Sequence, residues 1–586
     1  MFQKTHSSGR YSSSRAGVRA LSITLLLAGF TGSGLAQVVE ENPAPLIFGE
    51  QRSGLGPSAV SVEGDSTPIG VDLKRLVILN ELDRSAPDPA WDRSGVDLSD
   101  GGKTLQNAAF QKRLEGYVGK PLSQKLLNEI RAEIIRRYRA ADKPFVSVVA
   151  PPQEVTGGTL TLQVIEFKAG EVTAEGNVWT PSGYILDHVR QQPGEEIDAS
   201  NLVQDLNWLN LNPYRSLGAV FEPGTVPGAT DIVLRSNERR PWTVYAGYAN
   251  SGTAASGRDR VFAGGNVANL PFLDHQLSYL STLNPESLGY GDVVNVTHAP
   301  GYASHALSYF APIDIAGQVR TKLQLTAGYV ESGSVLNPFF DEFSQSWAIT
   351  SELAFPLDLP GTRQFDVFAG FDVKRQFSDI EFADTVVSKS NDDVGQFRVG
   401  ARGRYGFNYG SLDTDGVVEA YAALSPGGIL ANSTSYTYFY GSVEQITRLN
   451  QGFGLSFALA GQATADTLPD LEKIAIGGSA TVRGYTTNEI SGNSGVYGSL
   501  ELRSPIFGHD FGSGLTLGAE AYAFFDAGYV WDDTSDDRGI QSVGAGVELA
   551  VSEYLTATIE AGHALSGAPD TQQGETSIFG TFVIRY

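Results

Sequence analysis

The residue with the clearest capacity for chemistry is an arginine inside a glycine-rich stretch. Arg483 lies in "IAIGGSATVRGYTTNE", residues 474–489, between Val482 and Gly484 and directly ahead of Tyr485. The flanking sequence alternates apolar and polar residues as β-strands do, so nothing local requires this charge. A guanidinium carries a permanent charge and grips a carboxylate through two parallel hydrogen bonds. The chemistry expected of Arg483 is therefore ion pairing.

Three acidic residues downstream lie on the polar faces of alternating segments and are candidate partners: Glu501, Glu520 and Asp526. Asp526 is the most suggestive because it lies in "FFDAG", where Phe524 shares its face and Gly528 leaves room for a close backbone approach. Two interpretations stay open. Arg483 is either a solvated charge on an outer loop, or it lies in an interior against one of these carboxylates.

Signals for enzymatic chemistry are missing from the sequence. There is no G-x-S-x-G elbow and no phosphate-binding G-x-x-x-x-G-K-[ST] loop. The histidines are scattered, and His298 with His305 is too isolated to suggest a metal site. The net charge of −24 argues against nucleic acid as a partner, since phosphate binding needs a basic face. We therefore predict no enzyme, no cofactor and no metal.

The N-terminus reads as an export signal. Four basic residues precede an apolar run at residues 20–30: Lys4, Arg10, Arg15 and Arg19. The run is too short to cross a hydrocarbon layer of ~30 Å as a helix. Small residues predict cleavage after Ala36, so that residues 1–36 are a signal peptide and the mature chain starts at Gln37. Residues 37–70 are rich in Pro, Gly and Ser and are predicted to be flexible.

Two tandem β-α-α-β-β units follow, at residues 71–168 and 169–238. In the first, we expect a strand at 73–82, helices at 104–119 and 122–142, and strands at 144–153 and 157–167. In the second, we expect a strand at 171–177, helices at 181–194 and 199–211, and strands at 217–224 and 230–238. A repeat of this order predicts two small α+β domains, and the pattern alone assigns them no task.

From residue 239 to Tyr586 the helical period disappears, and long alternating segments are separated by Gly, Asn, Asp and Ser. Soluble sandwiches also alternate, but these segments are long, an export signal precedes them, and the chain ends within a strand on an aromatic residue. About 347 residues at about 21 per strand and turn predict roughly 16 antiparallel strands in a membrane barrel. Counting back from a periplasmic Tyr586 places the loop at 466–494, which carries Arg483, on the outer side.

These residues resemble a known family. The tandem units look like POTRA domains, and "VRGY" (482–485) followed by "F-x-D-x-G" (Phe524, Asp526, Gly528) is the signature of the POTRA-barrel translocator superfamily. Residues 151–166, 209–234 and 239–260 resemble the two-partner secretion branch of ShlB/FhaC/HecB type. Some relatives begin with an amphipathic plug helix, and residues 37–70 show no such pattern.

The resemblance implies a 16-stranded pore in the bacterial outer membrane with two periplasmic POTRA domains. It would secrete one large β-helical exoprotein, unfolded in transit, without nucleotide hydrolysis, and activation of that partner is a further expected role. The loop would fold into the lumen and pair Arg483 with Asp526. The other expected partners are outer-membrane lipid and, through C-terminal Tyr586, the barrel-assembly machinery. A barrel-assembly factor and a passive porin are the alternatives.

Overall fold

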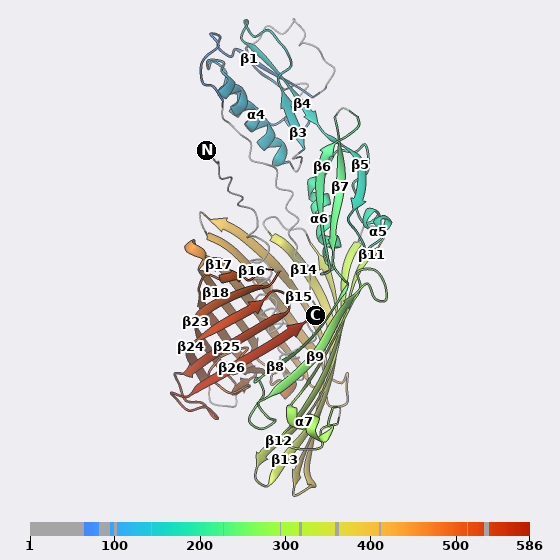
Figure 1. Cartoon of the computed structure of the whole chain (residues 1–586), viewed down its shortest axis with the longest axis vertical. Helices are drawn as coiled ribbons and strands as arrows, with labels where there is room; N and C mark the ends of the chain where they lie inside the picture. The colour runs from blue at the N-terminus through green and yellow to red at the C-terminus, as the bar shows by residue number, and fades with distance from the viewer. Residues whose placement is uncertain are drawn as a thin grey trace. The chain divides into compact units, whose positions relative to one another are not determined.

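The computed structural model describes residues 64–80, 94–98, 102–141, 143, 145–226, 228–293, 295–315, 319–357, 362–409, 412–512, 514–532 and 538–586. The predicted export signal, its cleavage after Ala36 and residues 37–63 of the predicted flexible segment lie outside these residues. The chain forms two compact units, divided between residues 240 and 241 (Figure 1). Among the helices described, none has the length and apolarity to cross a membrane.

The first α+β repeat contains four strands and two helices: β1 (Arg75–Leu79), β2 (Gly95–Asp97), α3 (Ala108–Glu115), α4 (Gln124–Arg139), β3 (Val146–Val149) and β4 (Thr159–Glu166). The sheet order is β2-β1-β4-β3. Helix α4 begins after Ser123, whose hydroxyl accepts a hydrogen bond from the N–H of Leu126, and it buries Ile130, Ile134 and Tyr138 along one stripe. Strand β2 was not predicted; it lies in the polar connection between the first strand and first helix.

The second repeat keeps the predicted order: β5 (Lys168–Glu175), α5 (Ser182–Asp187), α6 (Ala199–Leu209), β6 (Arg215–Pro223) and β7 (Ala229–Glu238). Its sheet has β7 in the centre, parallel to β5 and antiparallel to β6. The core joins both helices to the sheet through buried residues such as Ile185, Leu206 and Ile232. Within the described residues β6 pairs with β7 alone, so one of its edges is unpaired.

The remaining residues form one closed antiparallel barrel. Its strands are β8 (Trp242–Ala249), β9 (Arg260–Ala268), β10 (Gln276–Leu283), β11 (Gly301–Ile315), β12 (Val319–Asn337), β13 (Phe340–Pro356), β14 (Thr362–Phe382), β15 (Thr385–Tyr409), β16 (Leu412–Pro426), β17 (Ser435–Arg448), β18 (Gly454–Thr464), β21 (Ser494–Arg503), β22 (Phe507–Asp510), β23 (Thr516–Trp531), β24 (Arg538–Val551), β25 (Leu555–Ala564) and β26 (Thr576–Arg585). The one α-helix described in its connections is α7 (Pro285–Tyr290).

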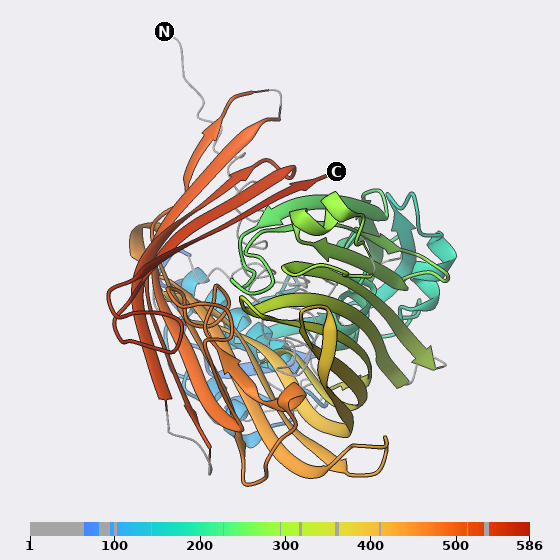
Figure 2. The same ribbon diagram turned by 90° about the horizontal axis from the view of Figure 1, so that it is seen from below.

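The barrel has 16 strand positions, because 17 labelled strands include β21 and β22, which both pair with β23 and share one position. Strand β26 pairs with β8 and closes the wall; the red last strand ends beside the green first strands in Figure 2. The count agrees with the prediction. Since it is even, the barrel begins and ends at the same rim, opposite the loop that carries Arg483.

Side chains on the barrel strands alternate between two environments. On β21, Leu500 and Leu502 are exposed on the outer face while Glu501 and Arg503 are buried inside. On β23 the outer residues include Phe525 and Tyr529. An apolar outside and a charged inside are the arrangement expected of a wall that faces lipid and encloses a polar lumen.

Strands β18 and β21 are joined by residues 465–493, which we call the lumen loop. It contains a short 3-10 turn at Asp470–Glu472 and a hairpin of its own, formed by β19 (Ile474–Ile476) and β20 (Ile490–Gly492). The hairpin was not predicted, since three-residue strands show no alternation to detect. It holds the two arms of the loop together and presents residues 477–489 as its tip.

Candidate functional site

The lumen loop packs against the inner wall of the barrel. Its apolar residues form one buried cluster with inward residues of β23, β24 and β25: Ile474, Ile476, Val482, Tyr485 and Ile490 with Val530, Ile540 and Ala564. Both Val482 and Tyr485 are completely buried. The interpretation of Arg483 as a solvated surface charge is therefore wrong, because the loop that carries it lies inside the barrel.

Arg483 and Asp526 form a two-pronged ion pair. The guanidinium donates from Nε to Oδ2 of Asp526 at 2.7 Å and from Nη2 to Oδ1 at 2.7 Å. The backbone N–H of Arg483 also donates to Oδ2, at 3.1 Å. Asp526 has no exposed surface and Arg483 keeps 7%. A buried bidentate pair with a third, backbone bond fixes both the position and the direction of the side chain.

Two further carboxylates and the hydroxyl of Ser499 also bond this guanidinium, and the hydroxyl accepts from Nη2 at 2.9 Å. Nη1 donates to Oε1 of Glu501 at 2.7 Å and to Oε2 of Glu560 at 3.2 Å. The guanidinium carbon lies 3.5 Å from the centre of the Phe524 ring, a cation–π contact on the face predicted for that residue. Strands β21, β23 and β25 thus each supply an anion to one arginine. Glu560 was not predicted as a partner of Arg483. Its strand β25 lies two strands beyond β23, which carries Asp526, and no motif marks the residue.

Glu520, the third predicted candidate, does not reach Arg483. It pairs instead with Arg503 on β21, whose guanidinium also bonds Glu501 at 2.7 Å and Glu548 at 2.9 Å. Glu501 therefore accepts from both arginines and links the two clusters. The alternation of β21 in the sequence places Arg503 on the inner face, and this pattern could have indicated the second cluster.

Glycines let the loop backbone approach the wall. Gly484 has φ +100°, and a Cβ built there would lie 2.9 Å from the carbonyl carbon of Gly562. A Cβ at Gly562 would lie 2.5 Å from the nitrogen of Gly484. Gly528 makes room for the loop, since a Cβ there would lie 2.6 Å from Cγ2 of Ile476. The prediction at Gly528 was a close approach of backbone, whereas the nearest atoms belong to the side chains of Ile476 and Val482 in the loop.

Tyr485 fixes the far side of the tip. Its hydroxyl lies 2.7 Å from the carbonyl oxygen of Gln541 and 2.9 Å from that of Ser566, and accepts from the N–H groups of both residues at 3.2 Å. The four residues of the "VRGY" motif therefore all contact the wall, through packing, ion pairing, backbone approach and hydrogen bonding in turn.

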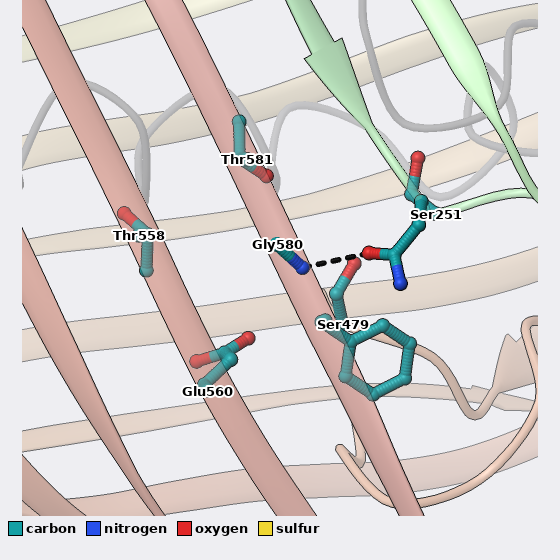
Figure 3. A pocket seen from close by; sticks show the side chains of 8 residues that line it. Ser251, Ser479, Thr558, Glu560, Gly580 and Thr581 are labelled. Atoms are coloured by element: carbon teal, nitrogen blue, oxygen red, sulfur yellow. Dashed lines mark hydrogen bonds between the residues drawn. The ribbon is translucent and has the colours of Figure 1, made fainter.

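A small pocket remains between the loop tip and the last strands. Figure 3 shows Thr558 and Glu560 on one strand, Gly580 and Thr581 on its neighbour, and Ser479 of the tip and Ser251 beside them. Asn250 accepts a hydrogen bond from the N–H of Gly580 at 2.6 Å. The space of about 20 Å³ has room for a water molecule but not for an extended polypeptide. With the loop in place, this pocket is no path for a chain.

The arrangement is suited to holding a loop against the barrel wall. Each charged group around Arg483 is bonded to another charged group of the protein. Within the described residues, no group of three or more His, Asp or Glu side chains has the arrangement for a metal ion.

Comparison with known proteins agrees with this architecture. The chain is 24% identical over 475 residues to outer membrane transporter CdiB-2 of Burkholderia pseudomallei (strain 1026b), covering 77% of this chain and 76% of that protein. It is 21% identical over 460 residues to heme/hemopexin transporter protein HuxB of Haemophilus influenzae, covering 75% of this chain and 77% of that one.

Solved structures share the fold. CdiB from Escherichia coli superimposes with a TM-score of 0.67 at 15% identity, over 99% of this chain and all of that one. CdiB from Acinetobacter baumannii gives a TM-score of 0.60 at 16% identity, over the same shares. Residues 93–166 match the ShlB-type POTRA domain, and residues 228–551 match haemolysin secretion/activation protein ShlB/FhaC/HecB. The chain belongs to the ShlB/FhaC/HecB family of haemolysin secretion/activation proteins.

Proposed function

We propose that the lumen loop occupies the pore at rest and leaves the wall when an exported partner protein passes. Members of this family are outer-membrane transporters that secrete a partner protein, and their POTRA domains are periplasmic. This chain is likewise an outer-membrane transporter that secretes a partner protein, with its POTRA domains in the periplasm. The observation that carries the proposal is the buried Arg483–Asp526 pair, which joins a connection between two strands to the inner wall of the barrel. The pair would hold the loop in the docked position and would have to break, and later form again, for the loop to leave and return.

The cargo is proposed to be one large exoprotein that crosses unfolded and folds into a β-helix outside. Folding on the outer side would prevent the chain from slipping back, so that transport needs no nucleotide. The proposed cargo receptor is the unpaired edge of β6. An extended segment can add to such an edge through backbone hydrogen bonds while the edge reads little side-chain identity.

The outer face and the C-terminus suggest two further contacts. Exposed apolar residues such as Phe525 and Leu500 would face outer-membrane lipid. Tyr586 exchanges backbone hydrogen bonds with Val244 of β8, and its side chain is 64% exposed. We assign this exposed terminal aromatic to recognition by the barrel-assembly machinery during insertion. A passive porin would not need the POTRA domains, and the family does not favour an assembly factor.

A reversible disulfide tests whether the loop must move. The chain has no cysteine, so Ile476→Cys with Gly528→Cys introduces a single possible bridge between loop and wall. The 2.6 Å between Cγ2 of Ile476 and a Cβ at 528 puts the two Cβ atoms in range of a disulfide. We expect the oxidised protein to stop releasing its partner into the medium and the reduced protein to recover.

The reduced double variant is the control for the substitutions themselves, since Gly528→Cys alone would leave Cγ2 of Ile476 in the way of the new side chain. Secretion by the fully oxidised double variant at the rate of the reduced double variant would refute the proposed movement.

A further inference from the structure

The first arm of the lumen loop is held by barrel residues other than those that hold Arg483. Glu472 ends the 3-10 turn of this arm, and its side chain is fully buried. Its carboxylate accepts from Nζ of Lys374 at 2.5 Å, from the hydroxyl of Tyr438 at 2.9 Å and from Nε2 of Gln396 at 3.1 Å. These donors come from β14, β17 and β15. None of these strands contributes to the Arg483 site.

Lys374 depends on this loop residue for its counter-charge. Its side chain is 2% exposed. The nearest acidic residue on the same face of its own strand is Asp372, which is already engaged by the guanidinium of Arg398 at 2.7 and 3.1 Å. A buried ammonium without a carboxylate is strongly unfavourable. The Lys374–Glu472 pair therefore stabilises the docked arm and is not an incidental contact.

Packing supports the same arm. Leu471 is buried in a cluster with residues of β10, β11, β12, β13 and β15, including Leu280, Tyr302 and Val394. The side-chain amide of Gln462 donates to the carbonyl oxygen of Glu472 at 2.8 Å and to that of Asn493 at 3.1 Å, joining the two ends of the loop.

We propose that Lys374 and Glu472 form a second, separate anchor of the lumen loop, so that the loop leaves the wall only when two ion pairs on different strands have broken. This inference rests on the proposed function of the loop. Releasing Arg483 frees the tip, at residues 477–489, while the first arm stays bound at Glu472. Both residues are positioning residues, since their effect on transport passes through the loop.

Thiol labelling of the full-length protein tests the anchor. In a Leu471→Cys background, the introduced cysteine is unique and buried beside Glu472. We expect Lys374→Met to raise its rate of reaction with a maleimide by about tenfold or more, because the buried carboxylate loses its cation. Lys374→Arg keeps the charge and should stay within about twofold of the Leu471→Cys reference.

Lys389→Met is the matched control. Lys389 lies on the neighbouring strand β15 and pairs with Asp379 at 2.6 Å, but it is exposed and touches no loop residue among the described contacts. Its loss should leave labelling unchanged. If Lys374→Met does not give a heat-modifiable barrel, Glu472→Gln replaces it, since that residue belongs to the loop and not to a barrel strand.

Labelling of Lys374→Met or Glu472→Gln at the reference rate would overturn the second anchor. The measurement needs no partner protein, whereas the disulfide lock does. A normal labelling rate with a functional lock would refute the anchor alone, and rapid labelling with an ineffective lock would refute the proposed movement alone.

Discussion

At the scale of single residues, the one positive charge of Arg483 is shared among three carboxylates. Its guanidinium contacts Asp526, Glu501 and Glu560, but only Asp526 lacks another cation or donor of comparable quality. Glu501 also bonds Arg503, and Glu560 accepts from the hydroxyl of Tyr522 at 2.8 Å. Loss of the arginine therefore leaves mainly Asp526 without a counter-charge.

We expect Arg483→Ala to abolish or severely reduce secretion while the barrel still inserts. Stranding the fully buried Asp526 carboxylate costs up to about 3 to 5 kcal/mol. The closed hydrogen-bonded wall does not depend on that contact. Secreted partner in the medium and heat-dependent migration on a gel measure the two properties separately. Wild-type secretion by Arg483→Ala would show that the pair has no role in transport.

The double variant Arg483→Ala/Asp526→Ala should destabilise the docked loop less than the sum of the two single variants, by a coupling energy of roughly 0.5 to 3 kcal/mol. Complete recovery is not expected, because Glu560 would still lose a donor. Lysine at 483 should rescue only partly, since it has no planar fork for Asp526. Strictly additive effects on loop exposure, measured by labelling Ile476→Cys, would contradict the direct pairing.

A methyl group at Gly562 should displace the loop as effectively as loss of a charge. The added Cβ would meet the backbone nitrogen of Gly484 at 2.5 Å, and backbone cannot move aside as a side chain can. Gly580→Ala on β26 is the control, because the nearest atom lies 3.9 Å from its Cβ. We expect low secretion for Gly562→Ala and normal secretion for Gly580→Ala. Equal secretion by both would mean that the loop does not press on β25.

The sequence drew attention to residues where a motif or an alternation marked the position. Glycine neighbours drew attention to Arg483, and alternation placed Glu501 and Asp526 on an inner face. Glu560 and Lys374 were missed because they meet the loop across separations of 77 and 98 residues, which no local pattern reveals. Glu520 was correctly placed on the inner face, but it pairs with Arg503 and not with Arg483. An inward-facing position does not determine how high along the barrel a residue lies.

At the scale of elements, strands and helices with a strong period were predictable and short ones were not. The apolar stripe of α4 and the alternation of β21 and β23 stand out in any window of ten or more residues. Strands β2, β19 and β20 contain three residues each and form because a neighbouring segment of the chain offers a pairing partner. Their formation depends on tertiary contacts that a local pattern does not contain.

Deleting residues 169–236 should stop secretion while the remaining barrel still inserts. The deletion removes β6 and its unpaired edge, which is the proposed receptor for the cargo, and the barrel wall contains none of these residues. Partner remaining in the periplasm, detected after osmotic release, is the expected result. Secretion at the normal rate would show that the second POTRA domain is not needed to recognise the cargo.

At the scale of the whole molecule, we propose a mature protein that starts at Gln37, two POTRA domains at 71–168 and 169–238, and a barrel from 239 to 586. N-terminal sequencing of protein from the outer-membrane fraction should begin at Gln37. The sample should migrate faster on a gel before boiling than after, because a closed barrel resists detergent. An intact N-terminal Met1, or migration independent of heating, would contradict this organisation.

The most direct test of the account compares exported proteins in the bacterium that carries this chain, with the chain deleted and then restored as wild type or as Arg483→Ala. Mass spectrometry of the medium and cell surface should show one large protein disappearing on deletion and returning with the wild type. Arg483→Ala should not restore it. An unchanged set of exported proteins, or a general loss of other outer-membrane barrels, would contradict secretion of a dedicated partner through this pore.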